Sequence, residues 1–167
     1  MKNIIKSMAA LAILLLVSCG GKEEKKKEGI QIGQKPAPTE TPKETPASTV
    51  KPSETIDLTN KGIGPIKNVD LSAEVDDAMA AKGLDLFKSK CMACHKVDKK
   101  FIGPAPTGIL ERRTPEWVMN MILDPEGMVQ KDPLAKALLQ EFNGSPMANQ
   151  NLTEEEARQV LEYFRTL

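Results

Sequence analysis

The segment Cys91-Met92-Ala93-Cys94-His95 decides the fold, because here two cysteines meet the single histidine of the chain. The thiols of Cys91 and Cys94 lie about one helical turn apart, so each can add to one vinyl group of the same porphyrin. His95 follows directly and brings an imidazole beneath the iron. The spacing C-x-x-C-H therefore predicts covalent attachment of one c-type haem.

Three other interpretations of this segment account for less of it. A thioredoxin-like dithiol would need a βαβ pattern around the cysteines, and the sequence shows none. A zinc site usually needs four Cys or His ligands, whereas the segment offers three and the chain has no second histidine. A plain pair of buried cysteines would leave His95 without a role.

The amino terminus has the pattern of an export signal. Lys2 and Lys6 precede an apolar run over residues 8–17, which as a helix would span about 15 Å, half of a bilayer core. That length is typical of a secretory signal and not of a membrane span. Leu16-Val17-Ser18-Cys19 resembles the lipobox of bacterial lipoproteins, which implies cleavage before Cys19 and a lipid on its thiol. We therefore expect residues 1–18 to be a lipoprotein signal peptide, with an ordinary cleaved signal as the alternative.

Residues 19–68 have the composition of a disordered tether. They are rich in Pro, Thr, Lys and Glu, and their sparse apolar residues follow no helical or strand period. Such a segment cannot bury enough apolar surface to offset the entropy lost on ordering. Lys22–Glu28 is a charge run that resembles a surface-export signal of some diderm bacteria. We expect a bacterial envelope protein with its folded domain in the periplasm, and cell-surface exposure as the alternative.

Residues 69–167 have the length of one small domain and a helical pattern. We expect helices over about residues 72–90, from Thr114 to about residue 124, over residues 132–142, and from Thr153 onward. Pro115 follows a good N-cap, and Thr153 with Glu156 forms a capping box. The residues after Asp124 are expected to form a flexible loop that carries Met128. Gly83 costs about 1 kcal/mol in mid-helix, which close approach of another helix would explain.

Several motifs in a fixed order resemble the class I cytochrome c family. They are Gly83 and Phe87 before the haem segment, Gly103-Pro104 after it, Pro146-Met147, and Val160 with Tyr163 in the last helix. The resemblance covers about residues 72–167. It implies an all-α class I cytochrome c fold, with about four helices wrapped round one covalently bound haem c. It also implies that the first and last helices cross at right angles, with Gly83 allowing the contact.

The resemblance also implies how the iron is held. His95 would be the proximal ligand, and the Pro104 carbonyl would accept a hydrogen bond from its other ring nitrogen. Pro106 departs from the family pattern, in which leucine often occupies this place. Because no second histidine exists, methionine is the candidate for the other face.

Four methionines of the domain remain candidates for that face: Met119, Met121, Met128 and Met147. The first two lie mid-helix beside Trp117, where methionine more often fills gaps. Met147 is favoured because it follows Pro146 in a loop before the last helix, where the family has its distal methionine. Met128 remains its rival. Trp117 is expected to pack against the haem.

The charge pattern argues against nucleic acid as a partner. The whole chain carries 23 basic and 23 acidic residues. From Asp70 onward 12 Lys and Arg stand against 16 Asp and Glu, a net charge of 12 − 16 = −4. Lysines nevertheless gather in the sequence around the haem segment: Lys82, Lys88, Lys90, Lys96, Lys99 and Lys100. They are either solvated surface or a basic rim that steers an acidic redox partner.

These features predict an electron carrier rather than an enzyme. A Met/His iron has no free coordination position and suits one-electron transfer. A lipid at Cys19 would hold the domain at a membrane, where it would carry electrons between respiratory complexes, to an acceptor such as a terminal oxidase or a denitrification reductase. The alternative is a haem-based ligand-binding, sensor or peroxidatic protein with a weakly held sixth ligand. A lipoprotein with a purely structural haem is a third hypothesis.

Overall fold

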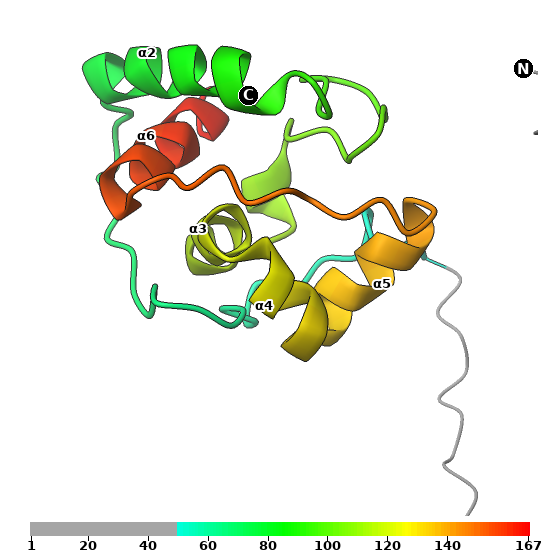
Figure 1. The fold of residues 1–167 in the computed structure, drawn as a ribbon. Coiled ribbons are helices and arrows are strands. Elements are labelled where there is room, and N and C mark those ends of the chain that lie inside the picture. The colour runs from blue at the N-terminus through cyan, green and yellow to red at the C-terminus, as the bar shows by residue number, and fades with distance from the viewer. Residues whose placement is uncertain (1–49) are drawn as a thin grey trace, which may run out of the picture. The chain divides into compact units, whose positions relative to one another are not determined.

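A computed structural model describes residues 50–167, so the predictions for the signal peptide, Cys19 and residues 20–49 lie outside the described residues. Within residues 50–167 the structure consists of helices joined by loops (Figure 1). The α-helices are α2 (Asp77–Leu86), α3 (Pro115–Leu123), α4 (Pro125–Lys131), α5 (Pro133–Glu141) and α6 (Glu154–Phe164). A π-helical turn, Phe87–Cys91, extends α2, and a 3-10 turn spans Ile109–Glu111. The predicted all-α class is confirmed.

Short polar side chains start every one of these helices, as the sequence pattern indicates. The Thr114 hydroxyl accepts from the Trp117 N–H, and Pro115 occupies the first position of α3. Thr153 and Glu156 form the predicted capping box at the start of α6, each side chain accepting from the other's backbone N–H. The starts of α3 and α6 therefore follow from local hydrogen bonds.

The segment after Asp124 is a helix and not the flexible loop that the sequence suggested. Asp124 closes α3, because its N–H donates to Asn120. Its carboxylate then accepts from the Gly127 N–H, and Pro125 begins α4. A residue before proline is disfavoured in the helical region, but the proline itself can start the next helix. Five α-helices are therefore found in residues 50–167, against the four expected.

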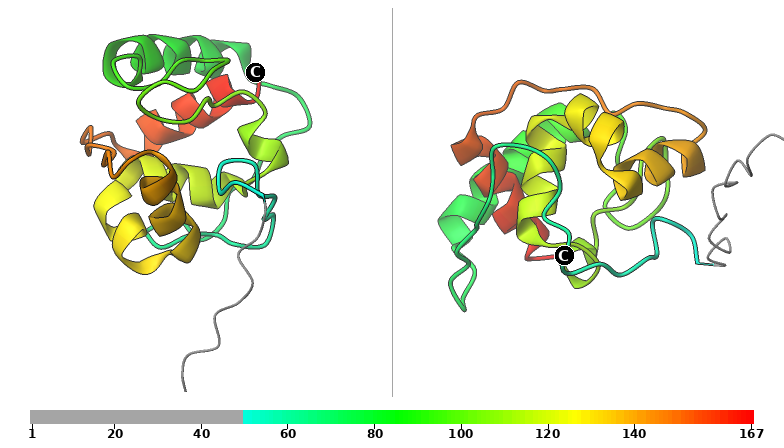
Figure 2. Two further views of the ribbon diagram at one scale, coloured as in Figure 1. Left: turned by 90° about the vertical axis from the view of Figure 1, so that its right-hand side faces the viewer. Right: turned by 90° about the horizontal axis from the view of Figure 1, so that it is seen from below.

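Helices α2 and α6 pack against each other in all three views of Figures 1 and 2. A Cβ atom at Gly83 would lie 1.9 Å from the carbonyl oxygen of Gln159, which confirms the predicted close approach at this glycine. The Phe87 ring lies 5.5 Å from the Tyr163 ring and 5.8 Å, nearly edge-on, from the Phe164 ring. Such tilted aromatic contacts each stabilise by about 0.5–1.5 kcal/mol. The helix pair thus brings the end of α2 to a fixed position.

The predicted boundary between tether and domain at residues 68 and 69 needs correction, because residues 50–68 pack on the helices. Figure 2 shows this segment in cyan to blue-green beside α3, α4 and α5. Ile66 is buried, and its N–H donates to the Asn120 side chain at 3.0 Å. The Asn120 amide in turn donates to the carbonyls of Lys61 and Ile66. Polar side chains of the domain hold a segment that has too few apolar residues to show a period.

None of the helices in residues 50–167 has the length and apolar character required to cross a membrane.

Candidate haem site

The C-x-x-C-H segment begins where α2 changes its hydrogen-bond pattern. The Met92 N–H donates to the Phe87 carbonyl at 3.1 Å, five residues back, which defines the π-helical turn. Single π-helical turns of this kind occur frequently at functional sites. The N–H groups of Cys94 and His95 both donate to the Cys91 carbonyl, at 3.0 Å and 2.9 Å. One tight turn therefore carries both thiols and the imidazole.

The His95 ring is fixed by a hydrogen bond and by a glycine. Its Nδ1 lies 2.8 Å from the carbonyl oxygen of Pro104, which is the partner that the family resemblance implied. A carbonyl can only accept, so Nδ1 carries the proton and Nε2 keeps a lone pair for a metal. A Cβ atom at Gly103 would stand 2.5 Å from the ring carbon Cε1. The Gly-Pro motif thus leaves room for the ring and orients it, and Pro106 does not prevent the contact.

A cavity of about 660 Å³ opens beside this turn. That volume falls in the range of about 300–1,000 Å³ that is typical of ligand pockets. Cys91, Cys94 and His95 line it together with Pro104, Trp117 and Met147, so the structure brings the predicted site residues of the domain to one place. Apolar side chains from α3, α5, α6 and the loops form much of the remaining wall, among them Ile109, Ile122, Leu138, Leu152 and Val160.

The four candidate methionines separate into two groups. Met147 and Met121 line the cavity. Met119 and Met128 do not belong to its lining and are buried in the core, 3% and 0% exposed. The Met128 sulfur accepts a hydrogen bond from the Ile63 N–H at 3.0 Å. Helix α4 therefore turns the rival methionine toward residues 62–63 and away from the cavity.

The chemistry of the thiols does not suit the zinc or dithiol interpretation. Burial, and secondly the neighbouring Cys94, raise the pKa of the Cys91 thiol to about 11. A redox-active cysteine usually has a lowered pKa, because the thiolate is the reactive form, so this raised pKa argues against a reactive dithiol. Among residues 50–167, no three His, Cys, Asp or Glu side chains come together in a way that could hold a metal ion. A protonated, buried thiol is compatible with a thioether.

Two arginines that sequence reasoning missed provide an independent test of whether haem fits. In residues 50–167 the buried side-chain nitrogens without a hydrogen-bond partner are Nε of Arg112 and Nε of Arg113, and both residues line the cavity. A buried donor without an acceptor is costly and rare. Haem c carries two propionate carboxylates, which are strong acceptors for arginine. The wall of the cavity thus contains two arginines, the residue type that pairs best with carboxylates such as the propionates.

Trp117 lines the cavity, and a hydrogen bond to Asp132 fixes its ring. It is 4% exposed, and its indole N–H donates to the Asp132 carboxylate at 3.3 Å. The Arg113 guanidinium lies 5.3 Å from the centre of the Trp117 ring. The Trp117 N–H is therefore occupied by Asp132, which is also the N-cap of α5. Nothing in the local sequence around Arg113 or Asp132 distinguishes them from surface residues, so their burial could not have been predicted.

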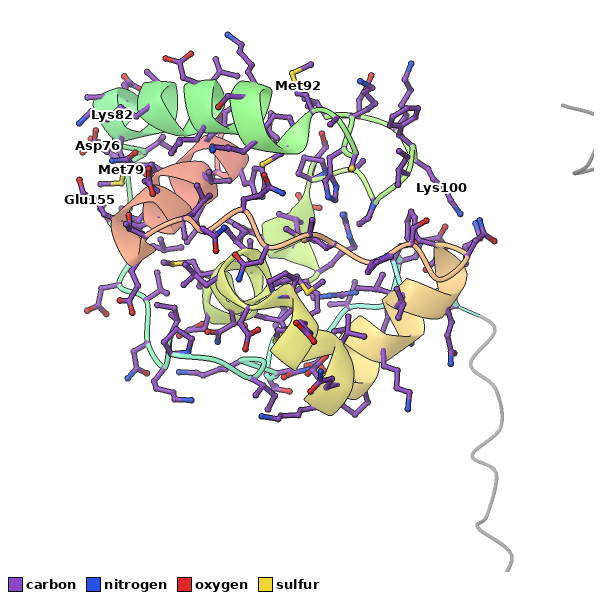
Figure 3. All side chains as sticks on the ribbon, in the orientation of Figure 1. Asp76, Met79, Lys82, Met92, Lys100 and Glu155 are labelled. Atoms are coloured by element: carbon purple, nitrogen blue, oxygen red, sulfur yellow. The ribbon has the colours of Figure 1, made fainter. Side chains whose placement is uncertain are left out.

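The predicted lysine cluster is only partly brought together. Figure 3 shows the Lys82 side chain, from the middle of α2, on the same side of the molecule as Asp76 and Met79 and away from Met92 and Lys100. The other five, Lys88, Lys90, Lys96, Lys99 and Lys100, belong to the end of α2 and to the loop that follows the haem segment. Three exposed apolar side chains lie in the same stretch: Met92 (39% exposed), Phe101 (50%) and Ile102 (45%). Lys96 stacks on the Phe101 ring at 4.9 Å.

Comparison with known proteins places this chain among cytochromes. The cytochrome c family model matches residues 80–167. A solved structure of cytochrome c from Rhodothermus marinus is 46% identical, with a TM-score of 0.60, over 62% of this chain and 88% of that one. Cytochrome c-551 of Ectopseudomonas mendocina is 33% identical over 52% of this chain and 99% of its own length. Cytochrome c2 of Rhodopseudomonas palustris is 28% identical over 53% of this chain and 97% of its own length.

The fold, the attachment turn and these similarities define a haem protein of the C-x-x-C-H type, and the chain belongs to the cytochrome c family. The family binds one covalent haem c, and Cys91 and Cys94 form the attachment motif of this chain. Its homologues are electron carriers.

Proposed function

We propose that this protein is a membrane-tethered monohaem cytochrome c that carries single electrons, with His95 and Met147 as the axial ligands of the iron. The observation that carries the proposal is the His95 ring, held 2.8 Å from the Pro104 carbonyl at the wall of a cavity that Met147 also lines. The haem, when bound, supplies the one-electron Fe(III)/Fe(II) couple. The chain's own residues set its ligands, its potential and its access to partners.

His95 contributes a ligand of fixed orientation. The bond from Nδ1–H to the Pro104 carbonyl selects the tautomer with Nε2 unprotonated and increases the electron density on that nitrogen. Gly103 has no side chain and therefore leaves room for the ring close to the backbone. A ligand that does not move between the two oxidation states keeps the reorganisation small, as a carrier requires.

Met147 is the methionine whose surroundings best suit the sixth position. It follows Pro146 in a loop between α5 and α6, whereas Met121 belongs to the helical backbone of α3. A loop can adjust to bring a thioether to the iron, and Pro146 restricts its backbone. Met/His ligation raises the potential and leaves no open position for a substrate. The protein would therefore transfer electrons without binding small ligands.

The surface beside the cavity supports a brief encounter with a redox partner. Lys90, Lys100 and Ile102 line the cavity, so the lysine-rich loop adjoins the haem site. Lysines around a small apolar centre of Phe101 and Ile102 would attract an acidic protein, and a small interface would release it quickly. Lys82 is left out of this docking surface because of its distance along α2.

The sequence of the amino terminus supports a location in the bacterial envelope. A lipid on Cys19 would hold the chain at a membrane, and the segment up to the described domain would let the haem domain move between a donor complex and an acceptor. A terminal oxidase and a denitrification reductase are both acceptors of the right kind. Mass spectrometry of the exported protein tests this part: an unmodified Cys19, or a mature chain that lacks it, would contradict the anchor.

Absorption spectroscopy and redox titration of the full-length holoprotein test the ligation. The oxidised protein should show the methionine-to-iron charge-transfer band near the red end of the spectrum. Met147→Ala should abolish the band and lower the potential, whereas Met121→Ala should keep it. Loss of the band in Met121→Ala but not in Met147→Ala would overturn the assignment. Binding of carbon monoxide by the reduced wild type would instead favour a ligand-binding or peroxidatic protein.

A further inference from the structure

The segment over residues 50–60, called the strap below, is attached to the domain by several side chains, and Glu141 and Arg113 hold its part nearest the cavity. The Glu141 carboxylate, at the end of α5, accepts from the Ser53 N–H at 2.8 Å and from the Ser53 hydroxyl at 2.6 Å. The Arg113 guanidinium donates to the carbonyls of Thr55 and, at 2.6 Å, Pro52. Further along, the Asp57 N–H donates to the Arg112 carbonyl at 2.9 Å. All of these contacts are polar.

The strap also forms part of the wall of the haem cavity. Lys51, Ser53 and Glu54 line the cavity, next to Glu141 and Arg113. Arg113 is only 1% exposed, although it is a permanent cation, and burial lowers its pKa. Its Nε and that of Arg112 are the buried nitrogens without a partner. The strap therefore lines the cavity together with Arg112, Arg113 and Glu141.

We propose that the strap is a positioning element for the haem: the Ser53–Glu141 and Arg113 contacts hold residues 51–54 as a cavity wall, which keeps water from the arginine-lined edge and thereby raises the reduction potential. The inference depends on the proposed function, because it needs a redox-active haem in the cavity. The strap lies outside the region that the family model matches, which begins at residue 80. Arg113 and Glu141, which hold the strap, lie inside that region.

The sign of the effect follows from the charge of the iron centre. The ferric porphyrin core carries one positive charge more than the ferrous core, so a water-poor wall disfavours the ferric state. The Arg113 cation and the Glu141 carboxylate line the same cavity and have opposite effects on the ferric state, so the exclusion of water determines the sign. Opening the strap admits water to the cavity wall. The potential should therefore fall when the strap is released.

Two charge-neutral variants of the full-length holoprotein test the proposal. Ser53→Pro removes the N–H and the hydroxyl that donate to Glu141. Replacement of residues 51–55 by Gly-Ser-Gly-Ser-Gly removes Lys51 and Glu54 together and leaves the net charge unchanged. Thr59→Ala is the matched control, because its hydroxyl donates to Asp57 inside the strap. Hydrogen exchange at the Asp57 amide reports whether the strap has opened.

We expect both variants to exchange the Asp57 amide faster and to have a lower midpoint potential, with the methionine charge-transfer band intact and Thr59→Ala like the wild type. An open strap with an unchanged or higher potential overturns the proposal. If Ser53→Pro leaves the strap closed, the Gly-Ser-Gly-Ser-Gly replacement of residues 51–55 is the variant that tests whether the strap raises the potential. A wild type without covalent haem or without the methionine band would contradict the proposed function instead, so the two failures are distinguishable.

Discussion

Gly83 of α2 and Gln159 of α6 approach so closely that a Cβ atom on the glycine would lie 1.9 Å from the glutamine carbonyl oxygen. The same Cβ would lie 3.0 Å from Cβ of Tyr163. The first contact is with backbone, which cannot move aside as a flexible side chain can. The crossing of the two helices, and with it the position of the haem segment at the end of α2, depends on the absence of a side chain at residue 83.

Gly83→Ala should therefore destabilise the protein. In an exposed helix the same exchange stabilises by about 1 kcal/mol, because alanine is the better helix former. Here the clash should reverse the sign and cost about 1–3 kcal/mol in the free energy of unfolding, as overpacking does. Urea denaturation of the holoprotein measures it. The exposed neighbour supplies the control, since Ala81→Gly should cost only about 1 kcal/mol.

Glu162 forms a buried ionic cluster that joins α6 to the start of α2. The side chain is 0% exposed and accepts from the Asp76 N–H at 2.8 Å and from Arg165 at 2.5 Å, with Arg158 as a third partner. Burial alone would raise the pKa of Glu162, but these hydrogen bonds and the two arginine charges together bring that pKa below its ordinary value. The ionised form is therefore the one that the fold stabilises.

The stability of the fold should fall in acid through this group. A carboxyl with a depressed folded pKa contributes fully above its unfolded pKa of about 4.3 and loses that contribution as the pH falls through the folded value. Glu162→Gln should lower the free energy of unfolding by about 3 kcal/mol at pH 7, because it removes the buried charge and leaves two partly buried arginines without their carboxylate partner. Denaturant titrations from pH 7 to pH 3 should then show a flatter pH dependence than in the wild type.

The exposed Glu155 is the control for that series. Its carboxylate accepts a hydrogen bond from the Gln159 amide at 3.4 Å and, among residues 50–167, has no arginine partner like those of Glu162, so Glu155→Gln should leave the acid dependence unchanged. An equally steep loss of stability in Glu162→Gln and in the wild type would assign the acid sensitivity to other carboxyls.

Gly103→Ala should disturb the proximal ligand. The added Cβ would stand 2.5 Å from Cε1 of His95, so the ring must shift or rotate and its bond to the Pro104 carbonyl must lengthen. We expect a lower midpoint potential, a changed spectrum of the oxidised haem and a loss of about 1–3 kcal/mol of stability. Ser89→Ala is the control, because Ser89 is an exposed residue of the π-helical turn before the haem segment. It should change none of these properties. An unaltered midpoint potential in Gly103→Ala would mean that the position of the His95 ring does not affect the potential.

Met128 should behave as a core residue. It is 0% exposed, and Met128→Ala would create a cavity, so a loss of about 2–5 kcal/mol is expected in thermal or denaturant unfolding. Met128→Leu nearly conserves the volume and should cost less than about 1.5 kcal/mol. Both variants should retain the methionine charge-transfer band. Its disappearance in the leucine variant would restore Met128 as a candidate for the iron.

Local signals predicted much of this molecule. The C-x-x-C-H turn, the caps at Thr114 and Thr153 and the glycine contact at residue 83 each depend on residues close in sequence or on one missing Cβ. The strap and the buried Arg113 depend on contacts between residues about 60 positions apart, which no periodicity reveals. Helix α4 was missed because Asp-Pro was interpreted only as the end of a helix. Only the structure of α4 shows that the Met128 side chain points away from the cavity, and so distinguishes it from Met147 as a candidate ligand.

Charge reversal at Lys99 and Lys100 should slow electron transfer to an anionic oxidant. Both side chains are exposed, and Lys100 lines the haem cavity. At 0.1 M salt the screening length is about 10 Å, so only charges near the point of transfer act on the oxidant. We expect the rate with ferricyanide to fall by about tenfold in Lys99→Glu/Lys100→Glu, because steering by a local field has this size. Stopped-flow absorption measures it.

Lys82→Glu is the control, since the Lys82 side chain lies on the side of the molecule that holds Asp76, away from Lys100 (Figure 3). Its rate with ferricyanide should stay close to that of the wild type. A cationic oxidant, tris(phenanthroline)cobalt(III), should react faster with the double variant, because the sign of the local field has changed. The differences should vanish at 1 M salt, where the screening length is about 3 Å. Lys82→Glu changes the net charge by −2 and the double variant changes it by −4. An effect of Lys82→Glu on the logarithm of the rate that is half that of the double variant would therefore show that only the net charge matters and that electrons do not leave beside the lysine-rich loop.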